Sequence, residues 1–348
     1  MAIQQMFLGA GGGGGGKSID ELFNTHLFTG NDTPGNARTT GIDLTGSASD
    51  EGGLVWFKPR VDYSSHSLYD TERGAAKYLM SNTGNGEYDV VPNYGSNHGL
   101  TSFNNNGFTV GTNVNGENGS LNIVAWTFRR YPEFFDIVKW NGSTDNASKT
   151  INHNLGTNPG MIIIKNYSTT GSTDWYTYHS ALDTPNQNYI RLEQTAAAAT
   201  PQGQNIWNAT STSFQAAEYL AAAQANNSYV AYLFAEDTDY IKCGEYDSNY
   251  AVGATPQTVD LGWEPQFVMI KHVGPTTYSN SGWYMFDNER VNSYPSRLYA
   301  NTTGGEPTTA YIDITSTGFT VDPLMAGPGG INYPAGDQHI YMAIRKPD

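Results

Sequence analysis

Cysteine is almost absent from this sequence, in which Cys243 is the only thiol among 348 residues. A single cysteine excludes an intrachain disulfide and a cysteine-based metal site. Long apolar runs are also missing, because no segment reaches the roughly eighteen apolar residues of a membrane-spanning helix. These absences favour a protein that is made in a reducing cytosol and does not insert into a membrane.

Charge is scarce as well, and most of it is negative. Charged residues make up 15% of the chain, the formal net charge is −15, and no basic cluster is longer than two residues, as in Arg129-Arg130. Nucleic-acid binding depends on clustered Lys and Arg that neutralise phosphates, and binding to anionic membrane surfaces needs basic clusters too. We therefore expect neither nucleic acid nor membrane among the partners.

Motifs for catalysis, cofactor binding or metal binding do not stand out. The chain has no nucleophile elbow, phosphate loop, His-Glu-x-x-His motif or EF-hand spacing, and its seven histidines include no pair at ligand spacing. His153 precedes a turn, and we interpret it as a structural hydrogen-bonding residue. We predict no catalytic residue, no cofactor and no metal, in a protein that is not an enzyme.

The residues that are abundant indicate β-structure. Aromatic residues make up 13% of the chain and glycine numbers 39, while the polar surface is supplied by Asn, Ser, Thr and Gly, which favour turns and weaken helix interiors. Short strands separated by turn signals are typical of sandwiches and barrels. Only residues 195–200 and 215–226 favour a helix, and a loop is equally open there. We predict an all-β fold.

One strand pattern occurs three times, at residues 53–58, 160–165 and 267–271, where a short apolar run ends on Lys58, Lys165 and Lys271. A short apolar run between turn signals predicts a strand that is buried on both faces. A lysine at the edge of a sheet can lay its methylene stem on apolar neighbours while its ammonium reaches water. We interpret the three lysines as such strand ends, and the alternative is that they bind an anionic sugar or a partner carboxylate.

Further landmarks follow each lysine in the same order. They are an aromatic or apolar segment, a leucine with polar residues, a phenylalanine after a small polar cluster, and a last strand with alanine at its centre (residues 124–126, 230–232 and 342–344). We predict three tandem homologous β-sandwich units of the jelly-roll or concanavalin-like type, at residues 19–131, 132–238 and 239–348. The related segments 70–73 and 287–290 place acids beside an arginine, which predicts local ion pairs.

The N-terminal residues 1–18 differ from the rest of the chain. They lack the positive region and long apolar core of a secretory signal, and residues 11–16 are six consecutive glycines that form a flexible tether by composition. We predict that the peptide ahead of the tether docks on another protein through Ile3, Met6, Phe7 and Leu8. An unstructured chain end is the alternative.

The repeats also carry a resemblance, in residues 52–60, 70–74, 103–108, 124–130, 134–136 and 153–156 and in the opening residues 1–10. These residues resemble a repeat domain of unknown function in virion proteins of marine bacteriophages, especially cyanophages. The resemblance implies concanavalin-like β-sandwiches and a structural virion component of the tail or fibre, with no catalytic residues to carry over. The third unit lacks the His-Asn-Leu-Gly signature of residues 153–156.

Two classes of function remain open. The first is a non-enzymatic virion protein, made in the host cytoplasm, that joins other virion proteins through its N-terminal peptide in a tail appendage, tail tip or fibre and contacts the host surface; a capsid decoration protein is a variant of it. The second is a carbohydrate-binding protein or a remnant of a glycan hydrolase, in which loop aromatics stack on sugars, namely Trp140, Trp207, Trp263 and Tyr294. The same aromatics also suit a core or an interface.

Assembly is open in the same way. Fibres and tail tips are usually closed homo-oligomers, so we expect a homo-oligomer, with a trimer as one option. Three units within one chain can instead imitate a trimer and leave a monomer.

Overall fold

The computed structural model describes residues 16–61, 63–168, 172–200, 204–250, 255–274, 282–290, 296–307, 311–322 and 330–348. Within these ranges every regular element is a strand, apart from the 3₁₀ turn η1 (Ile19–Glu21) and the four-residue helix α1 (Val91–Tyr94). The predicted all-β class is therefore confirmed. No helix in the described ranges is long and apolar enough to cross a membrane.

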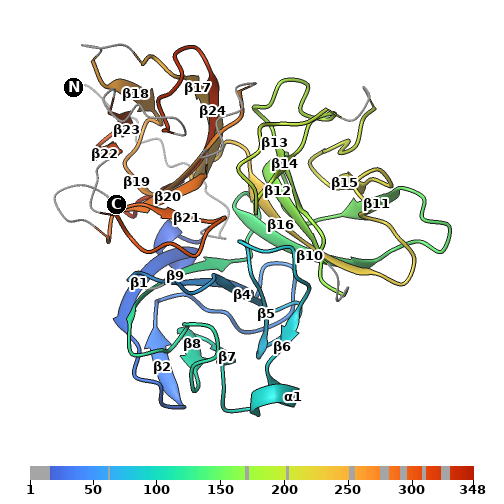
Figure 1. Cartoon of the computed structure of the whole chain (residues 1–348), viewed down its shortest axis with the longest axis vertical. Coiled ribbons are helices and arrows are strands. Elements are labelled where there is room, and N and C mark those ends of the chain that lie inside the picture. Colours follow the sequence, from blue (N-terminus) through green and yellow to red (C-terminus); the bar gives the residue numbers. More distant parts are fainter. Residues whose placement is uncertain are drawn as a thin grey trace, which may run out of the picture.

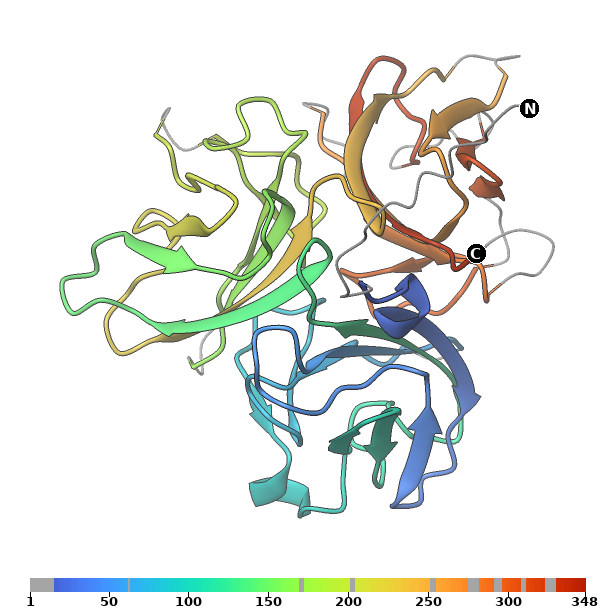
Figure 2. The same ribbon diagram turned by 180° about the vertical axis from the view of Figure 1, so that it is seen from behind.

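Three groups of strands surround a common centre, and Figures 1 and 2 show this from both sides. Each group contains one large and one small antiparallel sheet. In the first group the large sheet has the order β1 (Phe23–Thr29), β9 (Asn122–Arg129), β3 (Gly53–Pro59), β4 (Ser67–Asp70), β5 (Lys77–Leu79) and β6 (Tyr88–Asp89). Its small sheet has the order β2 (Asn36–Thr39), β8 (Gly107–Val110) and β7 (Leu100–Asn104).

The second and third groups repeat the order of the first five strands of the large sheet, without a counterpart of β6 among the described residues. The second large sheet is β10 (Phe135–Asn141), β16 (Ser228–Ala235), β12 (Pro159–Asn166), β13 (Trp175–His179) and β14 (Ile190–Arg191), with the small sheet β11 (Lys149–Asn152) and β15 (Ser213–Ala216). The third large sheet is β17 (Ile241–Asp247), β24 (Gln338–Arg345), β19 (Pro265–His272), β20 (Trp283–Asp287) and β21 (Leu298–Tyr299), with the small sheet β18 (Gln257–Asp260), β23 (Gly318–Val321) and β22 (Ile312–Thr315).

The large sheets also share one pairing register. Leu54 pairs with Asp70 in the first sheet, Met161 with His179 in the second, and Phe267 with Asp287 in the third. Residues that occupy the same place in this register are called register-equivalent below. Lys58, Lys165 and Lys271 are register-equivalent, because each lies four positions after the first residue of its pair.

The strands β3, β12 and β19 are buried along their whole length, as their apolar runs predict. Side chains alternate across a strand, so Leu54 and Trp56 join a central core shared by all three groups, whereas Val55 and Phe57 join the core between the first large and small sheets. An antiparallel strand usually has one solvated face. Here the second face is covered by the neighbouring groups.

The interpretation of the three lysines as strand ends that reach water is wrong. Lys58, Lys165 and Lys271 are all fully buried. The neighbouring group covers the strand end and supplies acceptors, because Lys165 Nζ donates to Gly84 O at 2.7 Å and Lys271 Nζ donates to Thr195 O at 3.1 Å. Lys58 Nζ donates to Pro59 O at 2.7 Å.

The two helix-prone stretches form no helix within the described residues. Residues 215–226 start as the end of β15 and continue as turns that bury Leu220 and Ala222. Ala199 forms a bridge to Tyr189. Packing against the sheets therefore overrides the helical preference of alanine.

Candidate functional site

Three of the functional residues that the sequence suggested, Trp140, Trp207 and Trp263, lie within the described residues. Trp140 and Trp207 are buried core residues and not exposed loop aromatics: their indole nitrogens donate to Ala222 O and Asn188 O, both at 2.8 Å. A paired N–H group is what allows a tryptophan to be buried. Trp263 is half-buried and packs against the third core. Tyr294 and the docking residues Ile3, Met6, Phe7 and Leu8 lie outside the described residues.

His153 has the structural role that its sequence context predicts. Its Nε2 atom lies 3.1 Å from Thr210 O, and its Nδ1 atom accepts a hydrogen bond from Leu155 N at 3.2 Å. Burial lowers the pKa of His153. The neutral ring therefore joins two backbone segments.

Polar side chains instead gather at the seams between the three large sheets. Three rings, of Trp175, Trp283 and His66, occur at corresponding places: Trp175 and Trp283 pair with Lys165 and Lys271, and His66 directly precedes Ser67, the first residue of β4, which pairs with β3. Each ring nitrogen bonds a backbone carbonyl of another sheet: Trp175 to Met80 at 3.1 Å, Trp283 to Arg191 at 2.9 Å, and His66 to Tyr299 at 2.9 Å. The contacts run from the second sheet to the first, from the third to the second, and from the first to the third. They close a cycle.

His66 can take the same role as the two indoles in this cycle because its neutral ring carries one N–H donor. Its Nδ1 atom accepts the indole N–H of Trp56 at 2.8 Å, which leaves Nε2 as the donor to the Tyr299 carbonyl. Burial lowers the pKa of His66 to about 3. The ring is therefore neutral, with one acceptor and one donor.

A second cycle of contacts starts from Asp70, His179 and Asp287, which are register-equivalent and buried. Tyr232 donates its hydroxyl to Asp70 Oδ2 at 2.7 Å, Trp126 donates its indole N–H to Asp287 Oδ2 at 2.9 Å, and His179 Nε2 lies 3.0 Å from Tyr341 O. The three contacts connect the same pairs of sheets as the first cycle. Tyr232 and Trp126 are themselves register-equivalent.

Two of these positions belong to buried ion pairs, as the sequence predicts. Arg73 Nε lies 2.6 Å from Asp70 Oδ2, and Arg290 Nε lies 2.7 Å from Asp287 Oδ2. In the second sheet His179 and the buried Leu182 stand where the other sheets have Asp and Arg. The acid and the base are replaced together because a single unpaired charge is costly in a protein interior.

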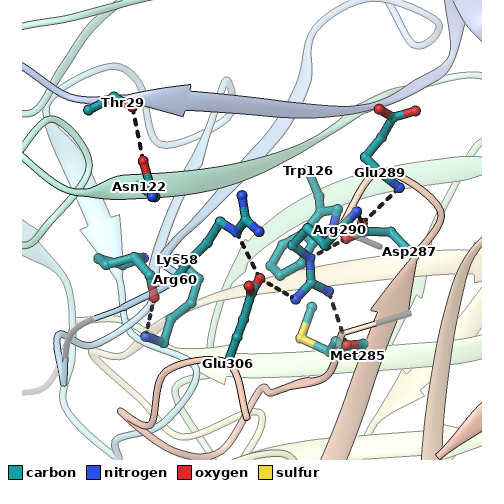
Figure 3. A network of polar contacts seen from close by, with 11 residues as sticks. Thr29, Lys58, Arg60, Asn122, Trp126, Met285, Asp287, Glu289, Arg290 and Glu306 are labelled. Carbon is teal, nitrogen blue, oxygen red and sulfur yellow. Dashed lines mark hydrogen bonds and ion pairs between the residues drawn. The ribbon is translucent and has the colours of Figure 1, made fainter. Parts of the chain in front are cut away.

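The seam between the first and third groups carries a network of polar contacts, drawn in Figure 3. Arg290 is fully buried and donates from Nη1 to Glu306 Oε1 at 2.9 Å and from Nη2 to Met285 O at 3.1 Å. Arg60 Nε donates to the same Glu306 oxygen at 2.9 Å. Glu306 therefore joins the arginine of the third group to that of the first.

An open cleft of about 610 Å³ lies at this seam, within the roughly 300–1,000 Å³ that is common for ligand sites. Its lining includes Arg60, Glu306 and Tyr63, and Tyr63 is 81% exposed. Asn122 also lines the cleft and accepts a hydrogen bond from Thr29 at 3.0 Å. The cleft thus presents two opposite charges, an amide and an exposed ring.

Metal ligands do not converge anywhere in the described part of the chain, which has no group of three or more His, Cys, Asp or Glu placed to hold an ion. Cys243 is buried, and burial raises the pKa of its thiol well above its usual value.

The polar contacts at the seams hold the three large sheets in one relative orientation. Their donors and acceptors point at one another across the seams.

The contacts at the seams were not predicted from the sequence, although an alignment of the three repeats contains a signal for them. Aligning the three repeats on the segments 66–73, 175–182 and 283–290 that follow the lysines puts His66, Trp175 and Trp283 in one column, and puts the joint change of Asp and Arg to His and Leu in two others. Such a joint change indicates residues in contact. It does not reveal that the other partners come from a different repeat.

Comparison with known families gives one match. Residues 19–347 match the family model described as "Domain of unknown function (DUF7483)", so the chain belongs to that family. No curated protein matches the chain.

Proposed function

We propose that this family member is a non-enzymatic structural protein of a bacteriophage particle, built as three tandem β-sandwich units of the jelly-roll or concanavalin-like type. In this proposal the units close into an internal trimer. The chain is part of a tail appendage, tail tip or fibre, and its N-terminal peptide attaches it to another virion protein.

The two closed cycles of contacts are the observation that carries this proposal. Most oligomers close by point-group symmetry, and here register-equivalent residues of one chain supply all three contacts of each cycle, for example Trp175 to Met80 and Trp283 to Arg191. The buried polar groups at the seams hold the sheets together. A rigid building unit suits an assembled particle, and the chain by itself is then a monomer.

The start of the described chain supports attachment near the centre. Lys17 N donates to the Tyr131 hydroxyl at 3.3 Å, and the Tyr240 hydroxyl donates to Lys17 O at 2.9 Å. Tyr131 lies between β9 and β10, and Tyr240 lies between β16 and β17. The first described residues therefore lie where two links between the sheets meet, and in this proposal the tether to the docking peptide starts there.

Immunogold labelling of phage particles with an antibody against the recombinant chain tests the proposal. Label on the tail or fibre is the expected result, and label on the head would replace it with the capsid decoration alternative. Particles that carry no label would overturn a virion role. Light scattering of the purified chain tests the internal trimer, which predicts the mass of a single chain.

Carbohydrate binding is the second candidate, and the cleft with the exposed Tyr63 favours it. An aromatic ring beside charged and amide groups is a common way to hold a sugar. A glycan array with the wild type and with Tyr63→Ala separates this candidate from a purely structural role. Release of reducing ends from polysaccharides is the assay for a hydrolase remnant.

A further inference from the structure

A second pocket, of about 220 Å³, opens between the second large sheet and the alanine-rich segment that follows β15. It is smaller than the roughly 300–1,000 Å³ of sites for drug-sized ligands, so it suits a ligand with a single ring. Its lining is both apolar and polar, and consists of Ile164, Asn166, Ser172, Thr173, Asp174, Tyr176, Leu220, Ala221, Ala222, Gln224 and Tyr229.

Beside Tyr176 the second group differs from the other two groups. Tyr176 is register-equivalent to Ser67 and Tyr284. In the first group Asn115 Nδ2 reaches Ser67 Oγ at 2.8 Å, and in the third group the ring of Tyr311 packs 5.6 Å from that of Tyr284. In the second group Tyr176 lines the pocket together with Ala221 and Ala222, whose side chains extend no further than Cβ.

The polar side of the pocket is built around Asp174. Arg191 Nε lies 2.7 Å from Asp174 Oδ2, and Gln194 Nε2 lies 3.4 Å from Asp174 Oδ1. These contacts orient the carboxylate. The Arg191 guanidinium also balances the charge of Asp174, which favours an uncharged ligand over an anion or a cation.

The remaining lining has complementary chemistry. Asn166 and Gln224 carry amides that can donate and accept hydrogen bonds, and Ile164, Leu220 and Tyr176 form an apolar wall. A sugar ring presents hydroxyls at its edge and C–H groups on its faces. We propose that this pocket binds one neutral monosaccharide unit, with Asp174 accepting bonds from its hydroxyls and the apolar wall covering a face of the ring.

This site is separate from the cleft beside Tyr63 and does not depend on the virion role. Titration of the full chain with glucose, galactose, mannose and N-acetylglucosamine, followed by calorimetry or ligand-observed NMR, tests it. At least one of these sugars is expected to bind saturably, and sialic acid is expected to bind more weakly.

Two pocket variants and one control sharpen the test. Asp174→Asn is expected to weaken binding at least tenfold, and Ala222→Leu, which fills the pocket, is expected to abolish it. Tyr94→Ala, at an exposed ring of α1 in the first group, is expected to leave binding unchanged, and melting curves check that each variant folds. Tyr63→Ala reports on the separate cleft. The inference is overturned if no neutral sugar binds saturably, if Asp174→Asn binds like the wild type, or if only Tyr63→Ala loses binding. A negative result leaves the structural role intact, because that role is derived from the seams.

Discussion

Trp126 donates its indole N–H to Asp287 Oδ2 at 2.9 Å, although the two residues lie 161 positions apart in the chain. The guanidinium carbon of Arg290 lies 5.3 Å from the centre of a Trp126 ring, and Arg290 Nε lies 2.7 Å from the same carboxylate oxygen. One indole of the first sheet therefore contacts both charges of a buried ion pair in the third. This links the stability of the two groups.

Trp126→Phe is expected to destabilise the whole chain. The buried Asp287 carboxylate loses a donor that water cannot replace, and a lost bond of this kind costs about 1–3 kcal/mol. Urea denaturation followed by fluorescence and circular dichroism measures the change. Trp140→Phe is the matched control, because its indole bonds the neutral Ala222 carbonyl, and it is expected to cost less. Equal costs for the two variants would contradict the role of the buried charge.

Arg290→Leu is expected to be severe, because it leaves Asp287 and the nearby Glu306 without their shared arginine. Breaking a buried pair from one side costs roughly 3–5 kcal/mol. The double variant Asp287→His with Arg290→Leu installs the residues of the second sheet and is expected to recover at least about 1 kcal/mol. A double-mutant cycle in urea measures this coupling. Simple addition of the single effects would show that the two positions act independently.

Glu193 is expected to make stability fall as pH rises through neutrality. Its Oε2 atom accepts a hydrogen bond from Trp175 N at 3.0 Å. In the first and third sheets the corresponding bonds, from His66 N and Trp283 N, are accepted by Asn82 and Asn301. Burial raises the pKa of Glu193 from 4.5 to about 7, and the adjacent Asp174 adds to this. The folded chain therefore binds more protons than the unfolded chain between these values. The stabilisation is complete below pH 4.5 and is lost as pH rises through 7.

Glu193→Gln removes this titration and keeps the acceptor. At about 1.4 kcal/mol per pKa unit, the wild type is expected to lose on the order of 2 kcal/mol more than the variant between pH 4.5 and 7.5. Urea midpoints across this range measure the difference. The exposed Glu133→Gln serves as the control and is expected to follow the wild type. Parallel curves for wild type and Glu193→Gln would refute the assignment.

Lys271 is expected to make the free energy of unfolding rise with pH above neutrality, which is opposite to the effect of Glu193. Burial lowers the pKa of its ammonium from 10.5 to about 7, so between these values the unfolded chain binds the extra proton. The free energy of unfolding therefore rises with pH above 7, and this contribution is lost as pH falls through 7. Lys271→Met is expected to flatten the rise between pH 7 and 9, as measured by urea titrations. A rise as steep as that of the wild type would contradict this prediction.

Local patterns were sufficient for several features. Apolar runs between turn residues established strands that are buried on both faces, such as β12, because their alternate side chains are all apolar. The repeated acid and arginine three positions apart established the pairs Asp70–Arg73 and Asp287–Arg290. In these cases the interacting groups are neighbours along the chain or within one strand.

Other features depended on what covers each residue. Lys165 resembles an exposed strand end until the first group places the Gly84 carbonyl over it, and Trp207 resembles a loop aromatic until Asn188 pairs its indole. The amino-acid order alone establishes β-strands and a threefold recurrence of motifs, since both are written in spacing. Only the folded chain decides which polar groups are buried, because their partners lie in other sheets and lose contact with water when the three groups close around the centre.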